Sequence, residues 1–558
     1  MTTWDTAVDF VIVGSGGGGM VAALTAADAG ASVMVLEKQP LIGGSTCMSG
    51  GIVWVPNNPV MRAAGIPDSY EDATAHFDAV VGDVGPASSP QRRHAFLTAG
   101  PEMVSFLQGR GVRFVHCPGY SDYYSNAKGG HDVGRGIEPV PFDGHVLGPW
   151  LDKLQPGLAQ SLGLSVMTNE ARSLSHYNRS IHAFAVSARV ALRTALARLR
   201  RQALLTNGAS LIAQLLQIAI DRGIPVWTEA PLEELIIEDG CVVGVRTVRD
   251  GAAMLVRARH GVLLAAGGFA HNRKMRGEFG GDQPNPAKWS IANPGDTGEV
   301  MQMAMGLGAK TDLMDEAWWL PSPRTGRFGA STLDQARQRP RTIYVDADGQ
   351  RFVNESNSYM EVGKAMYERD KTSRAVPCWL IFDDRYRKRY AHLRSSPGRF
   401  PRKLLESGNL KQAWTLQDLA RLCDIDADGL TATVERFNEH AAQGNDPDYG
   451  RGDSAYNRSL GDPNHKVHPC LGPIDEAPFY GVQVLPGDIG TCGGLLTNEH
   501  AQVLDQDDAP IAGLYATGNG TATVMGRHYL GPGASIANTM VFGFVAARHA
   551  TAGSREGS

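Results

Sequence analysis

The stretch VDFVIVGSGGGGMVAALTAADAGASVMVLEK, residues 8–38, decides the fold. Its apolar run at 10–13 predicts a buried strand, residues 20–29 a helix of small side chains, and residues 33–36 a second strand. Between the first strand and the helix, Gly14, Gly16 and Gly19 form a G-x-G-x-x-G motif. Strand, glycine loop, helix and strand in this order predict a Rossmann-like dinucleotide-binding unit.

Each part of this unit has a physical task. Gly14 allows a tight turn, Gly16 lets backbone N–H groups approach a diphosphate, and Gly19 lets the helix pack closely on the strand. The N-terminus of the helix attracts the negative phosphates. Glu37 ends the second strand and can accept hydrogen bonds from the hydroxyls of a ribose.

The segment that follows favours FAD over NAD. Residues 39–54 read QPLIGGSTCMSGGIVW, a second glycine-rich loop that suits the longer body of a flavin. Two further loops, LLAAGGF at 263–269 and GLYATGN at 513–519, are expected to return to the same cofactor, the first of them after a strand at 262–265. The predicted contacts of a non-covalently bound FAD in these four loops are Gly14, Ser15, Gly16, Gly17, Gly18, Gly19, Glu37, Lys38, Gly43, Gly44, Ser45, Thr46, Gly50, Gly51, Ala266, Gly267, Gly518 and Asn519.

The bulk composition excludes several classes of protein. A chain of 558 residues with a formal net charge of -5 has no general attraction to nucleic acid. Seven scattered cysteines without a C-x-x-C pair argue against a metal site or a disulfide framework and fit a reducing cytoplasm. The start MTTWDTAVDF lacks the features of a signal peptide, and no apolar run reaches the roughly 18 residues that span a bilayer. We therefore expect a cytoplasmic globular protein.

Taken together, the motifs resemble those of the flavoprotein family of fumarate reductases and succinate dehydrogenases, and within it the 3-ketosteroid Δ1-dehydrogenases. The resemblance covers nearly the whole chain apart from one insertion. The shared pieces are VGSGGGG, LEKQPLIGGST, SGGIVWVPNN, SDYY, LLAAGGF, GQRFVNES-x-x-Y, GLYATGN and GRHYLGPG. It implies the FAD-dependent desaturation of a 3-keto-4-ene steroid to the 1,4-diene, with side-chain-bearing ketones as further substrates and an external electron acceptor, quinone-like or other.

The family architecture implies an α/β fold in which an α+β catalytic domain is inserted into the FAD-binding domain. We expect the FAD-binding domain at 1–315 and 488–558, and the catalytic domain at 316–487. The sequence agrees, because DEAWWLPSP at 315–323 leaves the dinucleotide pattern and GDIGTCGGLL at 487–496 returns to it.

The resemblance also assigns roles to three tyrosines. The N-E-S-x-x-Y motif ends in Tyr359, which is the predicted base for the proton at C2 of the steroid. Tyr123, the first tyrosine of the D-Y-Y motif, is expected to hydrogen-bond that base and to assist its ionisation. Tyr529 and the N–H of Gly533 are expected to bind the C3 carbonyl oxygen. The remaining predicted flavin contacts follow directly in the chain and are Ala534, Ser535 and Ile536.

The chemistry explains why a second phenol is needed. A free phenol has a pKa of about 10, and burial in an apolar pocket raises the pKa further. A hydrogen bond donated to the developing phenolate lowers that cost, and an alkaline optimum follows. The chain departs from the family at Leu530, where proline is usual, which removes loop rigidity but no functional group.

Other functions remain open at this point. A 3-ketosteroid Δ4-(5α)-dehydrogenase uses related loops but is not expected to keep the D-Y-Y motif. A fumarate reductase-like enzyme needs an arginine where this chain has Tyr529, and the register of the motif argues against Arg527 as its replacement. A flavin-binding protein without catalysis would not require all three tyrosines. Two readings, an apolar pocket wall or structural core, apply to Trp318, Trp319, Pro321 and Phe328.

A basic insertion at about 150–205 sets this chain apart. Between Ala171 and Ile220 there are seven arginines and no aspartate, glutamate or lysine, and the core of this region interleaves arginines with apolar residues. Such a pattern predicts an amphipathic helix at a membrane surface. We expect residues 175–205 to dock the protein peripherally on the inner face of the cytoplasmic membrane, and a solvated or oligomer-forming hairpin is the alternative.

Overall fold

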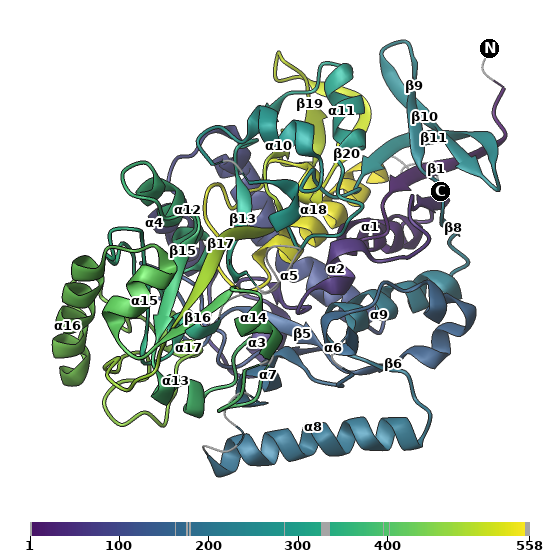
Figure 1. Ribbon diagram of the computed structural model, residues 1–558. Helices are drawn as coiled ribbons and strands as arrows, with labels where there is room; N and C mark the ends of the chain where they lie inside the picture. The colour runs from purple at the N-terminus through teal and green to yellow at the C-terminus, as the bar shows by residue number, and fades with distance from the viewer. Residues whose placement is uncertain are drawn as a thin grey trace.

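The structure is a computed structural model and describes residues 3–552, apart from 162, 175–176, 178–179, 284, 325–334, 394 and 401. Two bodies make up most of it, one coloured purple and yellow and the other green in Figure 1. The first contains both ends of the described chain, and the second comes from its middle.

The first body is built around an eight-stranded sheet. β1 (Thr6–Val13) lies at its centre, parallel to β2 (Val33–Leu36) on one side and to β11 (Ala252–Leu264) on the other. The sheet continues through β8 (Val226–Trp227) at one edge and through β20 (Pro510–Ala516) and β19 (Gln502–Leu504) at the other. β9 (Leu232–Glu238) and β10 (Cys241–Arg249) extend β11 as an antiparallel hairpin. The predicted strand at 262–265 is therefore the end of a much longer strand, and it stops at Leu264.

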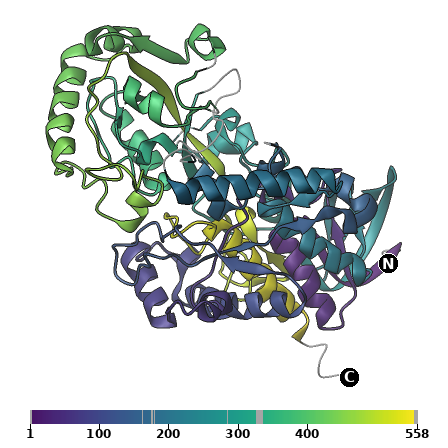
Figure 2. The same ribbon diagram turned by 90° about the horizontal axis from the view of Figure 1, so that it is seen from below.

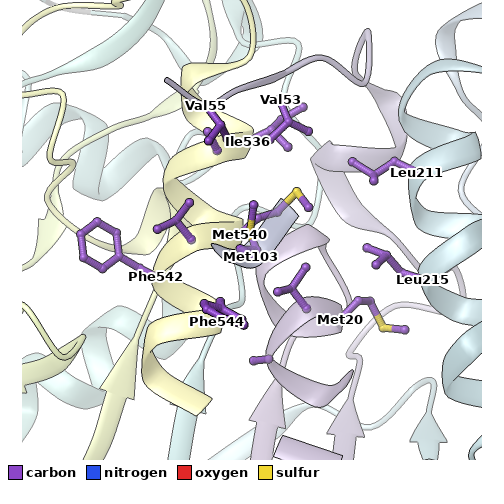
Figure 3. Packing of buried hydrophobic residues seen from close by; sticks show 14 of the residues in the cluster. Met20, Val53, Val55, Met103, Leu211, Leu215, Ile536, Met540, Phe542 and Phe544 are labelled. Carbon is purple, nitrogen blue, oxygen red and sulfur yellow. The ribbon is translucent and has the colours of Figure 1, made fainter. Parts of the chain in front are cut away.

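Small residues let the helices of this body approach one another closely. α1 (Gly17–Asp28) packs against α18 (Ala534–Ala550), the last helix that the structure describes. A Cβ atom on Gly543 would lie 2.3 Å from the carbonyl oxygen of Gly18. α9 (Asn207–Asp221) covers the other side of α1. Met20, Leu215 and Met540 fill the space between these three helices (Figure 3). This packing brings the first and last segments of the chain to one place.

The second body is a five-stranded antiparallel sheet with helices. Its order is β13 (Ala317–Pro323), β17 (Phe479–Thr491), β15 (Cys378–Phe382) and β14 (Thr342–Val345), with β16 (Leu410–Ala413) paired to β17. α12 (Tyr359–Asp370) packs on β13, and α15 (Leu416–Cys423) packs with α16 (Ala427–Gln443) at the outer side. β13 begins at Ala317 and β17 ends at Thr491. Both positions are close to the domain boundaries predicted at 315–316 and 487–488.

The remaining elements are shorter and lie within or beside these two bodies. The helices are α2 (Gly44–Met48), α3 (Pro59–Ala63), α4 (Tyr70–Val80), α5 (Pro90–Gly109), α6 (Leu158–Ser161), α10 (Arg273–Phe279), α11 (Glu299–Gly306), α13 (Asp384–Arg389), α14 (Arg402–Glu406) and α17 (Ala455–Ser459). The short strands are β3 (Val53–Trp54), β4 (Phe114–His116), β5 (Gly136–Pro139), β6 (Phe142–Asp143), β7 (Leu204–Leu205), β12 (Thr311–Asp312) and β18 (Gly494–Leu495).

The basic insertion forms α7 (Thr168–Leu174) and the long helix α8 (Ile181–Leu199). α8 lies along the lower edge of the molecule in Figure 1 and crosses the face turned to the viewer in Figure 2. One face of α8 is buried through Ala183, Val186 and Val190. One of its arginines is neutralised, because Arg193 forms an ion pair with Glu170 of α7. Glu170 lies just before the segment between Ala171 and Ile220 that contains no acidic residue. No helix within the described ranges is long and apolar enough to cross a membrane.

Candidate active site

A continuous cavity of about 1680 Å³ lies between the two bodies and is lined by residues of both. Its walls come from the glycine loops of the first body and from tyrosines that both bodies contribute. Cavities that hold one small ligand usually measure about 300–1,000 Å³. The space is therefore large enough for a cofactor and a second ligand.

The first glycine loop is shaped by close contacts that only glycine permits. Gly14 has a φ of +111°, and a Cβ atom there would lie 2.2 Å from the carbonyl oxygen of Ala265, the residue that follows β11. Glu37 is 8% exposed, and its carboxylate accepts hydrogen bonds from the N–H and hydroxyl of Ser15 and from the N–H of Gln39. A carboxylate has about four acceptor sites, so Glu37 keeps capacity for a ribose hydroxyl.

Most of the predicted flavin contacts line this cavity. Those that do are Gly14, Ser15, Gly16, Gly17, Glu37, Lys38, Gly44, Ser45, Thr46, Gly50, Gly51, Ala266, Gly267, Gly518, Asn519, Ser535 and Ile536. The predicted contacts that lie behind this wall are Gly18, Gly19, Gly43 and Ala534. Gly19 packs on the loop itself, because a Cβ atom there would lie 2.0 Å from the carbonyl oxygen of Gly14.

Two acidic residues line the part of the cavity formed by the glycine loops, here called the first half, but were not predicted from the sequence. Burial raises the pKa of Asp296 to about 7, although Ser45 donates a hydrogen bond to its carboxylate. Glu299 forms an ion pair with Lys38. Both lie within the glycine-containing segment NPGDTGE at 293–299, which is the signal that could have identified them.

The part of the cavity lined by Tyr123, Tyr359 and Tyr529 is here called the second half. These three tyrosines come from separate segments of the chain and meet in one cluster. Tyr123 lies in the loop between β4 and β5, Tyr359 begins α12, and Tyr529 precedes α18. The ring centroids are 5.1 Å apart for Tyr123 and Tyr359, 5.1 Å for Tyr359 and Tyr529, and 5.4 Å for Tyr123 and Tyr529. All three line the cavity, as does Gly533 at the N-terminus of α18. The structure thus brings together the four residues to which the sequence assigns the chemistry.

The cluster is poorly suited to ionisation as it stands. Burial raises the pKa of Tyr359 well above its usual value, and the neighbouring phenols of Tyr123 and Tyr529 raise it further. Burial also raises the pKa of Tyr123. The hydroxyl of Tyr529 shares a hydrogen bond of 2.9 Å with the hydroxyl of Ser535, and among the described residues the N–H of Gly533 meets no acceptor. Tyr529 and Gly533 can therefore both turn to a ligand oxygen.

Trp54 fixes the loop of Tyr123 against the loop of Tyr529. Its indole N–H donates to the carboxylate of Asp122 at 2.8 Å, and a Cβ atom on Gly531 would lie 2.3 Å from the indole ring. The backbone N–H of Tyr123 donates to the carbonyl oxygen of Leu530 at 2.9 Å. Leu530 is fully buried, so packing supplies rigidity where the family usually has proline.

The buried carboxylate of Asp122 has a counter-ion. Arg135 donates to it at 2.6 Å, and Arg135 also pairs with Asp68 at 2.8 Å. All of these side chains are buried, so the loop that carries Tyr123 is anchored by a charge network in the protein interior.

The other residues named from the sequence divide between the wall and the core. Trp318 lies edge-on to Tyr529 with a centroid distance of 4.9 Å, and it donates a hydrogen bond to Asn519. Trp319 and Pro321 are buried in the core, and Phe328 lies outside the described residues. Arg527 pairs with Asp315 and Glu316 and does not line the cavity, which agrees with the register of the motif.

Tyr456 and Arg337, which pack beside the tyrosine cluster, were not among the residues predicted from the sequence. Tyr456 of α17 lies 4.3 Å from Tyr123 between ring centroids, and its hydroxyl accepts a hydrogen bond of 3.0 Å from Arg337. Neither residue belongs to a recognisable motif. Their roles depend on packing between segments more than 100 residues apart.

The cavity extends away from the tyrosines to the basic insertion. There it is lined by Val166, Ala171, Leu174 and Tyr177, beside α7, and by Leu393, Pro397 and Leu404 of the second body. This end is mostly apolar. It lies close to α8, because α7 packs on that helix.

Comparisons with known proteins agree with this geometry. The family described as "FAD binding domain" matches residues 9–536. A "3-oxosteroid 1-dehydrogenase" of Mycolicibacterium smegmatis is 41% identical over 97% of this chain and 96% of that protein. A 3-ketosteroid Δ1-dehydrogenase from Sterolibacterium denitrificans, solved with 1,4-androstadiene-3,17-dione, has a TM-score of 0.91 at 37% identity and covers 98% of this chain and 100% of that one.

A more distant structure bears on the alternative. The 3-ketosteroid Δ4-(5α)-dehydrogenase from Rhodococcus jostii, solved with 4-androstene-3,17-dione, has a TM-score of 0.66 at 22% identity and covers 99% of this chain and 98% of that one. At this identity the likeness shows the fold alone. The prediction of an α/β flavoprotein fold of the fumarate reductase type is confirmed.

Proposed function

The chain belongs to the FAD binding domain family, and from this premise we propose that it is an FAD-dependent 3-ketosteroid Δ1-dehydrogenase. The observation that carries the proposal is that Tyr123, Tyr359, Tyr529 and Gly533 share one cavity with the glycine loops. Neither half alone would indicate a desaturase. Together they support proton removal and carbonyl binding beside a cofactor site.

The residues of the first half fit FAD. Gly14, Gly16 and Gly17 line the cavity with bare backbone at the N-terminus of α1, which suits a diphosphate. Glu37 suits a ribose. The same cavity wall continues toward the tyrosines with Gly50, Gly51 and Ser535. When bound, FAD supplies the acceptor for the hydride that leaves C1 of the steroid.

The protein's own part of the reaction is proton chemistry at the ketone. Tyr529 and the N–H of Gly533 donate hydrogen bonds to the C3 oxygen and stabilise the negative charge that develops there. Tyr359 takes the proton from C2, and Tyr123 hydrogen-bonds Tyr359 and stabilises its ionised form. Gly533 caps α18, so the positive end of a 17-residue helix dipole also faces this oxygen.

The substrate class follows from the shape and polarity of the cavity. The C3 ketone is neutral, and phenols suit it better than the arginine that a dicarboxylate requires. Beyond the tyrosines, the apolar end beside Leu174 and Leu393 gives room for a side chain at the far end of the steroid. We therefore propose that ketones bearing a sterol side chain are accepted together with short ones. An external acceptor, quinone-like in the simplest case, removes the electrons afterwards.

Product analysis tests this function against its alternative. The holoenzyme is incubated with androst-4-ene-3,17-dione or with 5α-androstane-3,17-dione and an artificial electron acceptor. We expect a new double bond at C1–C2 from the first compound. A product with a new double bond at C4–C5 from the second compound, and none from the first, would favour the Δ4-(5α) reaction. No product from either would contradict all steroid functions.

We also propose that α8 attaches the protein to a membrane surface. The face opposite its buried side exposes Ile181, Phe184, Leu192 and Leu199, with exposed fractions of 91%, 63%, 60% and 81%. Arg189 and Arg200 border this face and are exposed. Apolar residues flanked by arginines on one helix suit insertion between anionic headgroups. The apolar end of the cavity lies beside this helix, so a steroid dissolved in lipid has a short path to the site.

Liposome co-sedimentation tests the attachment. Replacement of Phe184, Leu192 and Leu199 by serine should reduce the fraction bound to vesicles of phosphatidylglycerol and phosphatidylcholine several-fold. The matched control is Trp414→Ser, which removes an exposed apolar side chain (71% exposed) next to β16 of the second body. Equal binding of the triple variant and the control would refute the attachment. A change in the oligomeric state of the triple variant would instead favour α8 as a contact between copies.

A further inference from the structure

A fully buried arginine stands behind the tyrosine cluster. Arg337 lies in the turn Gln335–Gln338 and has an exposed fraction of 0%. Its guanidinium donates to the carbonyl oxygens of Glu355 and Asn357 and, at 3.0 Å, to the hydroxyl of Tyr456. Arg337 therefore contacts the segment that leads into Tyr359. It also contacts the hydroxyl of Tyr456, whose ring packs on Tyr123.

The charge of Arg337 meets backbone and hydroxyl oxygens among the residues that the structure describes. Within the described part of the chain no aspartate or glutamate forms an ion pair with Arg337. The nearby carboxylate of Glu355 is engaged by Arg351 and Arg451 instead. A buried charge without a counter-ion is costly for stability. Such an arrangement points to a role that needs the positive charge.

Tyr456 connects this charge to the reacting phenols. Its ring lies 4.3 Å from that of Tyr123, whose ring in turn lies 5.1 Å from that of Tyr359. Burial raises the pKa of Tyr123, and the charge of Arg337 acts in the opposite direction on the pKa of Tyr123. Burial likewise raises the pKa of Tyr456, and both the charge and the hydrogen bond of Arg337 oppose this. Among the described residues, the other titratable groups that act on the Tyr123–Tyr359 pair are Tyr456 and Tyr529.

We propose that Arg337, acting through Tyr456, supplies the positive charge that stabilises the ionised Tyr123–Tyr359 pair. The inference rests on the proposed function. Tyr359 must first lose its own proton to solvent water or hydroxide. The C2–H bond then breaks, its proton goes to the oxygen of Tyr359, and its electron pair moves toward the C3 oxygen held by Tyr529 and Gly533. Arg337 touches neither the substrate nor the proton, so it is a positioning residue for charge.

The test is the pH dependence of kcat/KM in the holoenzyme. Arg337→Gln keeps an N–H donor for the carbonyl oxygens but removes the charge. Loss of a positive charge raises the pKa of the phenols further, so the limb on which activity rises with pH should move to higher pH by about one unit. At a pH below that limb, kcat/KM should fall about tenfold, whereas the steroid Kd and the flavin content should stay unchanged. Arg337→Lys, which keeps the charge, should return the limb toward its original position.

Two further variants make the test decisive. Tyr456→Phe keeps the ring on Tyr123 but loses the hydroxyl that Arg337 binds, so a smaller shift in the same direction is expected. Arg458→Gln removes an exposed arginine of the same helix as Tyr456, one that donates to two backbone carbonyl oxygens, and should leave the limb in place. An unchanged limb in Arg337→Gln would overturn the inference. If that variant does not fold, an unchanged limb in Tyr456→Phe would overturn it.

Failure of this inference is distinguishable from failure of the function. If the wild-type protein forms the 1,4-diene and Arg337→Gln keeps the wild-type limb, only the role of Arg337 is lost. If the wild-type protein forms no desaturated steroid, the function itself is wrong.

Discussion

The two halves of the cavity are built by different means. The cofactor half is made largely of backbone. Its glycine loops are local motifs in which consecutive residues of the chain line adjacent parts of the cavity. The catalytic half is made of side chains, from Tyr123, Tyr359 and Tyr529, which more than 400 residues of chain separate. The difference teaches that binding of FAD and chemistry on the ketone are separable. A change in one half should leave the other half measurable.

The largest effect should come from the backbone half. Gly14→Ala would place a Cβ atom 2.2 Å from the carbonyl oxygen of Ala265 at a φ of +111°. The loop must move, so the purified protein should contain no flavin and show no turnover. Gly30→Ala is the matched control, because Gly30 has a φ of +88° but open space around it. It should keep its flavin and lose about 1–2 kcal/mol of stability. Equal flavin content in the two variants would contradict the role of the first loop.

The catalytic half should show the reverse pattern. Tyr359→Phe removes the base, and turnover should fall about 10²–10⁴-fold. The variant should remain yellow, because no glycine loop is changed, and it should still bind the steroid with nearly unchanged Kd. Turnover within threefold of wild type would exclude Tyr359 as the base.

Loss of the carbonyl donor should have a smaller effect. Tyr529→Phe removes one of two donors to the C3 oxygen, and loss of one such donor typically costs about 10²-fold in kcat. The hydroxyl of Tyr529 also meets that of Ser535 at 2.9 Å, so Ser535→Ala is the control for that contact alone. If Ser535→Ala is as damaging as Tyr529→Phe, the phenol acts on the cofactor side and not on the ketone.

The smallest effect concerns stability and belongs to the cofactor half. Burial raises the pKa of Asp296 from 3.8 to about 7. Its contribution to stability is therefore fully present below about pH 4 and is lost as the pH rises through 7. Asp296→Asn removes this loss, so its Tm should exceed that of wild type by a few degrees at pH 8, and the difference should shrink as the pH falls toward 4. A Tm difference independent of pH would show that ionisation of Asp296 is not involved.

Much of the fold could be predicted from the sequence because the glycine motifs are local. The strand–loop–helix–strand unit of residues 8–38 lies close to its predicted bounds: β1 begins at Thr6 and α1 at Gly17. The strand of β11 was harder to delimit, because its first part belongs to a hairpin and alternates buried with exposed residues. The domain limits at 315 and 488 remain predictions.

The candidate site was predictable only where motifs carry it. The three tyrosines and Gly533 stand in motifs and meet in the cavity. Arg337 and Tyr456 stand in none, and their relation to the tyrosines arises from tertiary packing. Asp296 likewise depends on the approach of its loop to Ser45, 251 residues away in the chain. The acid-free appearance of the insertion was incomplete for a similar reason, because Glu170 lies just outside it.

The most direct test of the central claim is a single turnover of the holoenzyme without oxygen. Androst-4-ene-3,17-dione labelled with deuterium at C1 and C2 is mixed with excess enzyme, and both flavin absorbance and product are followed. If the tyrosines and the cofactor act in one cavity, the flavin should bleach once, and the product should be the 1,4-diene that has lost one label from each carbon. Bleaching without loss of label from both C1 and C2, or no bleaching at all, would contradict the account.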